Sequence, residues 1–231
     1  MLRILAIDTT ADVCSLALLG PDTELHIHEH LPRQHARQLL PRLDALFVEA
    51  GWSKRSVDTV VYGRGPGSFT GIRIAAGIAQ GIALGADCPI LPVSTLETLA
   101  YECAGSAQEC WVALDARMQE LYFARYQFDA EGLPVLIGEE QLLTPVQLPE
   151  PVQKVQLAGN GWLTDYGFSP AWQAVLAQNA PELTLPSAAA AARLAQQRLA
   201  QHPELALAPE AALPVYLRDK VTWDNKPKVG S

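Results

Sequence analysis

A glycine-rich run at residues 63–73, which reads GRGPGSFTGIR, is the feature that most constrains the fold of this chain. It follows an apolar segment typical of a strand and precedes a stretch of small residues typical of a helix. In α/β proteins a glycine-rich turn at such a junction brings backbone N–H groups close to phosphate. The run is not a standard nucleotide loop, however. It lacks a Gly-Lys-Ser/Thr ending, and Ser68 and Thr70 stand where a third fingerprint glycine would be.

Hydrophobic periodicity predicts a chain of mixed strands and helices. Strands are expected at 2–7, 13–19, 23–30, 59–62, 111–114, 120–128 and 155–158, and helices at 34–50, 70–85 and 187–201. Ser68 or Thr70 is expected to cap the second helix, and Ser187 the third. Composition loosens near Gly105, which predicts a boundary between two halves, 1–105 and 106–231. Both halves begin with a strand, an Asp-containing turn and a strand, so a faint internal duplication is expected.

Composition limits the function classes. A chain of 231 residues with 49% hydrophobic content can bury a substantial core in one large or two small domains. The net charge of −8 disfavours stand-alone binding of nucleic acid, which needs clustered basic residues. We expect no export signal and no apolar run long enough to span a bilayer. The four cysteines form no C-x-x-C pair and are expected to be buried, reduced thiols in a cytoplasmic protein.

The helix expected at 70–85 is unusual because it contains four glycines, and each interior glycine costs about 1 kcal/mol relative to alanine. Gly77, Gly81 and Gly85 recur every four residues and therefore share one face. Two interpretations stay open. This face packs closely on the protein's own sheet, or it forms a helix–helix interface with another subunit. Arg73 and Gln80 argue against a membrane span.

Five segments, in order along the chain, carry a family resemblance. They read ILAIDTT at 4–10, QH at 34–35 with LLP at 39–41, the glycine-rich run, VALDAR at 112–117 and PVYLR at 214–218. Together they resemble the bacterial TsaB (YeaZ) family, a paralogue of TsaD in the actin, Hsp70 and sugar-kinase-like ATPase superfamily. The resemblance implies an α/β fold of two tandem actin-like (ribonuclease H-like) subdomains, each a mixed sheet flanked by helices. The first, 1–105, would carry the partner interface. The second is 106–231, and its C-terminal segment could pack back on the first.

The resemblance also implies a function. The chain would be a non-catalytic accessory subunit that binds TsaD and, with TsaE, supports threonylcarbamoyl modification of the anticodon-adjacent adenosine in tRNAs reading ANN codons. It would meet tRNA only through the complex, form a homodimer when TsaD is absent, and avoid membranes. It would need no cofactor alone, although ATP and magnesium could bind in the complex. The expected partner or dimer contacts are Leu39, Leu43, Ile74, Gly77, Ile78, Gly81 and Gly85.

Active relatives in this superfamily grip nucleotide phosphates with two Asp-containing hairpins rich in glycine. Here neither turn contains glycine, and Ala116 and Arg117 stand where TsaD-like proteins have a Gly-Gly pair. The resemblance therefore implies a vestigial nucleotide cleft. Its expected residues are Asp8, Thr9, Asp115, Gly159 and Gly161. We expect Asp8 and Asp115 to bond backbone groups of their own turns rather than magnesium.

Metal chemistry is also expected to be absent. TsaD-like proteins carry a His-x-x-x-His pair, and Thr95 and Leu99 stand at those positions. Neither is a usual transition-metal ligand. A histidine row at 26, 28 and 30 is expected to be a solvated sheet face rather than a zinc site. Two less favoured functions stay open, an ATP-dependent kinase or ATPase of the same fold and a metallopeptidase.

Overall fold

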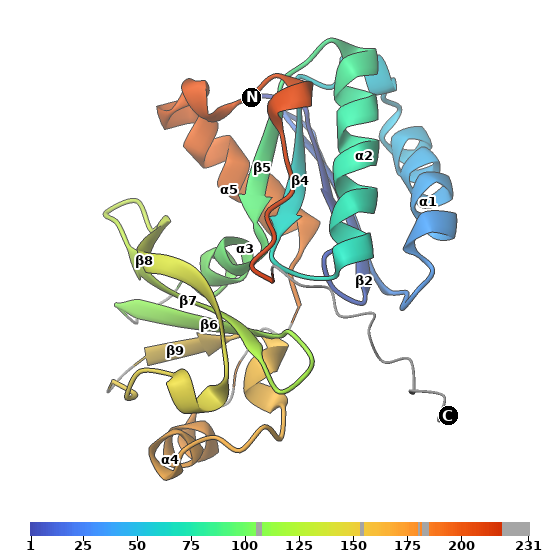
Figure 1. Cartoon of the computed structure of the whole chain (residues 1–231). Helices are drawn as coiled ribbons and strands as arrows, with labels where there is room; N and C mark the ends of the chain where they lie inside the picture. Colours follow the sequence, from blue (N-terminus) through green and yellow to red (C-terminus); the bar gives the residue numbers. More distant parts are fainter. Residues whose placement is uncertain (105–107, 153–154, 180, 182–184, 219–231) are drawn as a thin grey trace, which may run out of the picture.

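The computed structural model describes residues 1–104, 108–152, 155–179, 181 and 185–218. The predicted boundary at residue 105 lies outside these described residues. Within them, the chain forms a mixed α/β structure with two separate mixed sheets and flanking helices, as predicted (Figure 1).

The first sheet has the strand order β3-β2-β1-β4-β5. Its strands are β1 (Ile4–Asp8), β2 (Val13–Gly20), β3 (Thr23–His30), β4 (Thr59–Gly65) and β5 (Ile90–Ser94). β1, β2 and β3 form an antiparallel meander, and β4 pairs parallel to both β1 and β5. The expected strand at 23–30 is confirmed, while β4 runs three residues past its expected end, into the glycine-rich run.

The second sheet has the order β8-β7-β6-β9. Its strands are β6 (Glu109–Asp115), β7 (Leu121–Phe128), β8 (Pro134–Leu143) and β9 (Val155–Ala158). β6, β7 and β8 again form an antiparallel meander, and β9 pairs parallel to β6. The first four strands of one sheet therefore match the four strands of the other in order and direction. This confirms the predicted duplication and places Asp8 and Asp115 at equivalent strand ends.

Helices cover both faces of the first sheet (Figure 1). They are α1 (His35–Ala50) and α2 (Phe69–Ala86) on one face and α5 (Ala188–Gln201) on the other. Along β1, Leu5 and Ile7 pack towards α1 and α2, while Ile4 and Ala6 pack towards α5. A strand buried on both faces needs apolar residues at every position, which is why β1 is a continuous apolar run.

The second sheet is covered by two short helices, α3 (Thr95–Glu102) and α4 (Pro170–Gln178). α3 packs on the face of β6 that carries Val112, and α4 on the face that carries Trp111. α5 follows this sheet in the sequence yet packs on the first sheet. We therefore call the first sheet with α1, α2 and α5 the first lobe, and the second sheet with α4 the second lobe; α3 lies between them (Figure 1).

α2 and α5 begin at serine caps that the sequence predicted. The side chain of Ser68 accepts a hydrogen bond from the N–H of Gly71 at 3.3 Å, which confirms it as the cap of α2. Ser187 caps α5 in the same way through Ala190. All four cysteines are buried and none forms a disulfide, as expected.

α2 differs from expectation in one respect. Its 18 residues are long and apolar enough to cross a membrane by length and composition alone, whereas the sequence pattern predicted no such run. The helix extends one residue further at each end than predicted, and its isoleucines and alanines raise its mean hydropathy. Ala75 and Ala79 of this helix are fully buried in the core of the first lobe. The Gln80 side chain donates to the Ala212 carbonyl oxygen at 2.9 Å. α2 is therefore a helix of the folded lobe.

Candidate functional site

The β1–β2 turn of the first lobe and the β6–β7 turn of the second meet at a cavity of about 310 Å³. The start of α2 and the loop after β9 complete its wall. The side chains that carry polar or charged groups into this lining are Thr10, Asp12, His30, Ser68, Asp115, Arg117, Tyr122 and Asn160. The duplicated strands thus bring the two Asp-containing turns together, as the resemblance implied.

Asp8 does not line this cavity but lies in the protein interior. Its Oδ1 accepts hydrogen bonds from the backbone N–H and the hydroxyl of Thr10, at 2.8 and 2.7 Å. Its Oδ2 is buried and has no hydrogen-bond partner among the described residues. Burial raises the pKa of Asp8 from 3.8 to about 6, although the two bonds from Thr10 lower it. The expectation that Asp8 bonds its own turn is confirmed, and its expected place in the cleft is corrected.

Thr9 also faces inward, and its hydroxyl donates to the Gly71 carbonyl oxygen at 2.7 Å. Gly159 and Gly161 lie against the backbone of β6, where a Cβ on either would come within 2.8 Å of Ala113. Neither glycine nor Thr9 lines the cavity. The two glycines allow close packing against the backbone of β6, and Thr9 bonds to α2. Of the five residues expected in the cleft, only Asp115 lies in its wall.

Asp115 is surrounded by donors from the second lobe. Its Oδ1 accepts from the Arg117 backbone N–H at 2.7 Å and from the Tyr166 hydroxyl at 2.8 Å. Its own N–H donates to the side-chain oxygen of Asn160 at 3.0 Å. Its Oδ2 lies 3.1 Å from Nη1 of Arg117. The carboxylate is therefore committed to neighbouring groups, as expected.

Arg117 connects the two turns. Its Nη2 lies 3.4 Å from Oδ2 of Asp12 in the first lobe, while its Nη1 contacts Asp115 in the second. The guanidinium group is largely exposed, so these ion pairs stabilise the structure only weakly. Arg117, Met118 and Gln119 all have positive φ values between 57° and 62°. Three consecutive left-handed residues with side chains are strained, and the first of them, Arg117, stands at one of the two positions where the resemblance expected glycine in a phosphate-binding turn.

Asn160 and Asp12 line the cavity, although the sequence pattern did not predict either of them there. Asn160 stands between the two expected glycines, and a short polar side chain between glycines after a strand was the available signal.

The segment at 214–218 crosses between the lobes. The Val215 N–H donates to the Arg64 carbonyl oxygen at 2.8 Å. The Tyr216 ring packs on Phe69 with a centroid distance of 5.3 Å. Arg218 donates to the Ala116 carbonyl oxygen at 3.0 Å and pairs with Glu120 at 2.6 Å. This segment, together with the start of α2 and the β6–β7 turn, lines a second, more apolar cavity of about 260 Å³.

The described residues contain no group of three or more metal-ligating side chains. Thr95 and Leu99 on α3 are fully buried, and the Thr95 hydroxyl donates to that of Thr10 at 3.1 Å. The histidines of β3 point to the face that carries α5. His28 lies 3.2 Å from the Ser15 hydroxyl, and burial lowers its pKa. His35, on α1, lies 3.0 Å from the Ala11 carbonyl oxygen and supports the β1–β2 turn.

A second candidate surface lies on the outer face of α2. A Cβ on Gly77, Gly81 or Gly85 would meet no atom of the described residues within 4 Å, so packing within that part of the chain does not require these glycines. Ile74 and Ile78 beside them are partly buried. We call this surface, residues 74, 77, 78, 81 and 85, the glycine face. Of the two interpretations, packing on the protein's own sheet is wrong.

The expected contacts on α1 need correction. Leu39 and Leu43 are fully buried in the core of the first lobe, so neither side chain is available to a partner. Four other large apolar side chains on the two helices are exposed instead. They are Leu40 at 49%, Val48 at 81%, Phe69 at 36% and Leu84 at 63%. Helical spacing had shown which leucines share a face, but it could not show which face the sheet would cover.

The sequence of this chain is similar to those of known proteins over most of its length. A family model described as TsaD, tRNA N6-adenosine threonylcarbamoyltransferase, matches residues 28–226. The tRNA threonylcarbamoyladenosine biosynthesis protein TsaB of Escherichia coli (strain K12) is 40% identical over 233 residues, which cover 98% of this chain and 99% of that protein. The protein of the same name from Haemophilus influenzae is 36% identical over 240 residues, 98% of each chain.

Among solved structures, the chain is similar to "an uncharacterized protein with similarity to peptidase YEAZ" from Pseudomonas aeruginosa. That match has a TM-score of 0.79 and 36% sequence identity, and covers 94% of this chain and all of the other. A second structure, named YeaZ from Pseudomonas aeruginosa, matches to the same degree. Together with the two similar sheets, these likenesses confirm the predicted actin-like, ribonuclease H-like fold.

Proposed function

Because this chain belongs to the TsaB (YeaZ) family, we propose that it takes part in tRNA threonylcarbamoyladenosine biosynthesis as a non-catalytic subunit that binds TsaD. Its curated relatives carry that pathway in their names. The family model that spans most of the chain is that of the transferase TsaD itself, as expected for a paralogue. Two related chains with similar lobes can present matching helices to one another.

The observation that carries this proposal is the exposed glycine face of α2. Interior glycines destabilise a helix by about 1 kcal/mol each relative to alanine, and these glycines relieve no clash with any residue that the structure describes. A side-chain-free strip lets another backbone approach closely, and the partly buried Ile74 and Ile78 beside it offer apolar area. Exposed Leu84 extends the same surface. We propose that a TsaD helix packs here, and that a second copy of this chain does so when TsaD is absent.

The cleft supports a non-catalytic role. Asp8 is directed into the core, Asp115 is held by three groups of its own lobe, and Arg117 lies between the two turns. A metallopeptidase has no support among the described residues, because they contain no suitable ligand cluster. We further propose that TsaE joins the complex, that tRNA is met only there and in the cytoplasm, and that any ATP and magnesium act within the complex.

Co-elution with TsaD tests this proposal. Gly81→Leu places a large side chain in the middle of the glycine face and should abolish co-elution with TsaD, and with TsaE added, while the monomer stays folded. The matched control is Ala200→Leu, an exposed small residue on α5 at the far side of the sheet. Modification assays with each protein omitted would then report the loss of tRNA threonylcarbamoylation. Full co-elution by Gly81→Leu would contradict the proposed surface.

Catalytic status needs a separate measurement. The chain alone should show no ATP turnover above a buffer blank. Brisk hydrolysis that Asp115→Asn abolishes would favour an ATPase or kinase instead, whatever the co-elution result.

A further inference from the structure

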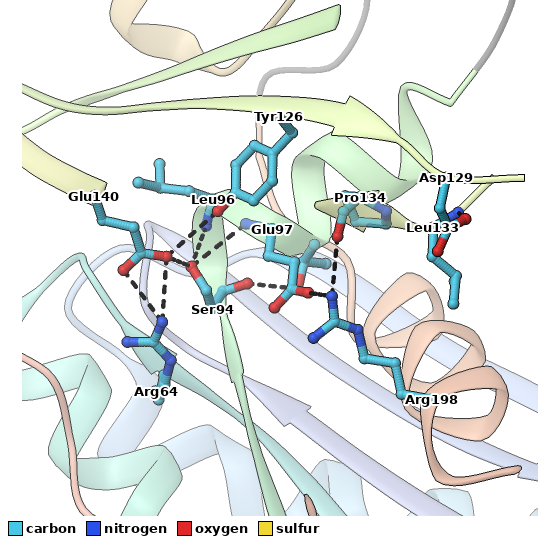
Figure 2. A network of polar contacts seen from close by, with 11 residues as sticks. Arg64, Ser94, Leu96, Glu97, Tyr126, Asp129, Leu133, Pro134, Glu140 and Arg198 are labelled. Atoms are coloured by element: carbon cyan, nitrogen blue, oxygen red, sulfur yellow. Dashed lines mark hydrogen bonds and ion pairs between the residues drawn. The ribbon is translucent and has the colours of Figure 1, made fainter. Parts of the chain in front are cut away.

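The long strand β8 of the second lobe is attached to the first lobe at both of its ends. Arg64, on β4, contacts Glu140 near one end, and Arg198, on α5, donates to the Pro134 carbonyl oxygen at the other (Figure 2). Both arginines belong to the first lobe, and both acceptors belong to β8. We call these contacts the Glu140 clasp and the Pro134 clasp.

Glu140 is the centre of the first clasp. Its two carboxylate oxygens lie 3.3 and 3.2 Å from Nη2 of Arg64. Its Oε1 also accepts from the Ser94 hydroxyl and, at 3.4 Å, from the Tyr126 hydroxyl (Figure 2). Ser94 ends β5 of the first sheet, and its Oγ caps α3 by accepting from the N–H groups of Leu96 and Glu97. The Glu140 side chain is only 7% exposed, whereas that of Arg64 is 26% exposed.

Arg198 makes the second clasp with two contacts. Besides the Pro134 carbonyl oxygen at 2.9 Å, it pairs with the Glu97 carboxylate on α3 (Figure 2). The turn before Pro134 is itself fixed, since Asp129 Oδ1 accepts from the Leu133 N–H at 2.7 Å. Burial raises the pKa of Glu97, while Arg198 and Arg64 lower it. The two clasps thus share one partly buried polar layer along α3, between the lobes.

We propose that the Glu140 and Pro134 clasps hold the two lobes at one fixed angle, so that this protein acts as a rigid two-lobed body rather than as a hinge that opens and closes. A buried carboxylate with three donors is stabilised only while those donors stay in place, and losing one partner of a buried pair is strongly destabilising. Rotation of the second lobe would pull Glu140 away from both Arg64 and Ser94. It would also move Pro134 away from Arg198, so both ends of β8 resist the same motion.

A fixed angle has a consequence for the glycine-rich run. Arg64 lies within that run, directly before the turn into α2, and Glu140 therefore ties the position of the turn to the second lobe. Glu140 and Arg64 are positioning residues in this proposal, because they act on the arrangement of the lobes and not on a ligand. The proposal does not depend on the proposed partner, since it concerns the chain alone.

Electron paramagnetic resonance of spin-labelled protein tests it. A cysteine at Ala200 on α5 and another at Ala174 on α4 place one exposed label on each lobe, and the four native cysteines are buried. Dilution with unlabelled protein removes distances between copies. The wild-type clasps should give one narrow distance distribution. Glu140→Ala should broaden that distribution and shift its mean.

Two further variants keep the test decisive. Glu140→Gln retains the size of the side chain but loses the charge, and Arg64→Gln changes the more exposed partner, which makes unfolding of the chain less of a concern. Each should broaden the distribution, and each should do so less than Glu140→Ala. The control is Glu139→Ala, an exposed neighbour on the same strand, which should match the wild type. Distributions of Glu140→Gln and Arg64→Gln that superimpose on the wild type would overturn the proposal, as would a broad distribution in the wild type itself.

Discussion

A Cβ at position 63 would lie 2.2 Å from Oδ2 of Asp8, so Gly63 on β4 provides the space that the buried carboxyl group of β1 occupies. The two residues are on neighbouring parallel strands. The first glycine of the glycine-rich run thus accommodates an internal side chain. Two later glycines leave space for backbone atoms: Gly67 lies against the carbonyl oxygen of Thr10, and Gly71 lies against that of Thr9. Packing within the first lobe therefore requires glycine at positions 63, 67 and 71.

Gly63→Ala should destabilise the protein by about 1–3 kcal/mol, the usual cost of forcing extra atoms into a packed site. The measurement is the free energy of unfolding in urea. Gly77→Ala is the matched control, because its Cβ would contact none of the described residues. It should instead stabilise the protein by up to about 1 kcal/mol through helix propensity. Adding Asp8→Ala to Gly63→Ala should recover part of the loss. Equal loss with and without that second change would show that the carboxyl group is not the obstacle.

Asp8 predicts a pH dependence of stability. Its pKa is about 6 in the folded protein against 3.8 for the ordinary side chain, and burial is the main cause. A raised pKa means that the folded state binds the proton more tightly. The stabilisation by this proton is therefore complete below about pH 4 and is lost as the pH rises through about 6.

Asp8→Asn, which stays neutral, should gain stability relative to the wild type between about pH 4 and pH 7. At 1.36 kcal/mol per pKa unit, the gain is at most about 3 kcal/mol. Urea unfolding of both proteins at several pH values measures the difference. Glu102, whose pKa burial raises to about 7, titrates in both proteins and cancels in the comparison. A difference in unfolding free energy between the two proteins that does not change with pH would contradict the raised pKa of Asp8.

The β6–β7 turn predicts a stabilising change. Gln119 has a φ of 61° and an exposed side chain, so Gln119→Gly should relieve the left-handed strain. After the entropy cost of glycine, the net gain is about 0.5–1 kcal/mol. Gln119→Ala shortens the side chain but keeps the Cβ, and it should give no gain. Thermal unfolding of the three proteins distinguishes these outcomes, and equal stability of the glycine and alanine variants would exclude strain at this position.

Metal analysis gives a simple further check. Because the described residues contain no cluster of three ligands, the purified protein should carry no stoichiometric zinc, and a chelator should leave its melting temperature unchanged. Stoichiometric zinc that Thr95→Ala leaves in place but His28→Ala removes would point to the β3 histidines instead.

Features set by nearby residues could be predicted from the sequence. Ser187 and, of the two candidates Ser68 and Thr70, Ser68 are confirmed as helix caps, since a cap needs only its own side chain and an N–H three residues on. The two Asp-containing hairpins were also visible, because each strand carries its own pattern. By contrast, β8 was missed. Most of its side chains are exposed or partly buried, so it has no clear apolar alternation. α4 was missed because Trp172 is its one fully buried side chain.

The sequence by itself determined the two-lobed plan, the duplicated hairpins and the common face of Gly77, Gly81 and Gly85, because strand and helix periods are properties of neighbouring residues. Only the tertiary structure decided which way these faces point. It turned the glycines of α2 to solvent and buried Leu39 and Leu43 of α1 in the core. It also placed Asp8 beside Gly63 and Glu140 beside Arg64, contacts between residues 55 and 76 positions apart in the chain. Packing across the sheet and between the lobes sets such contacts, and local pattern carries no record of them.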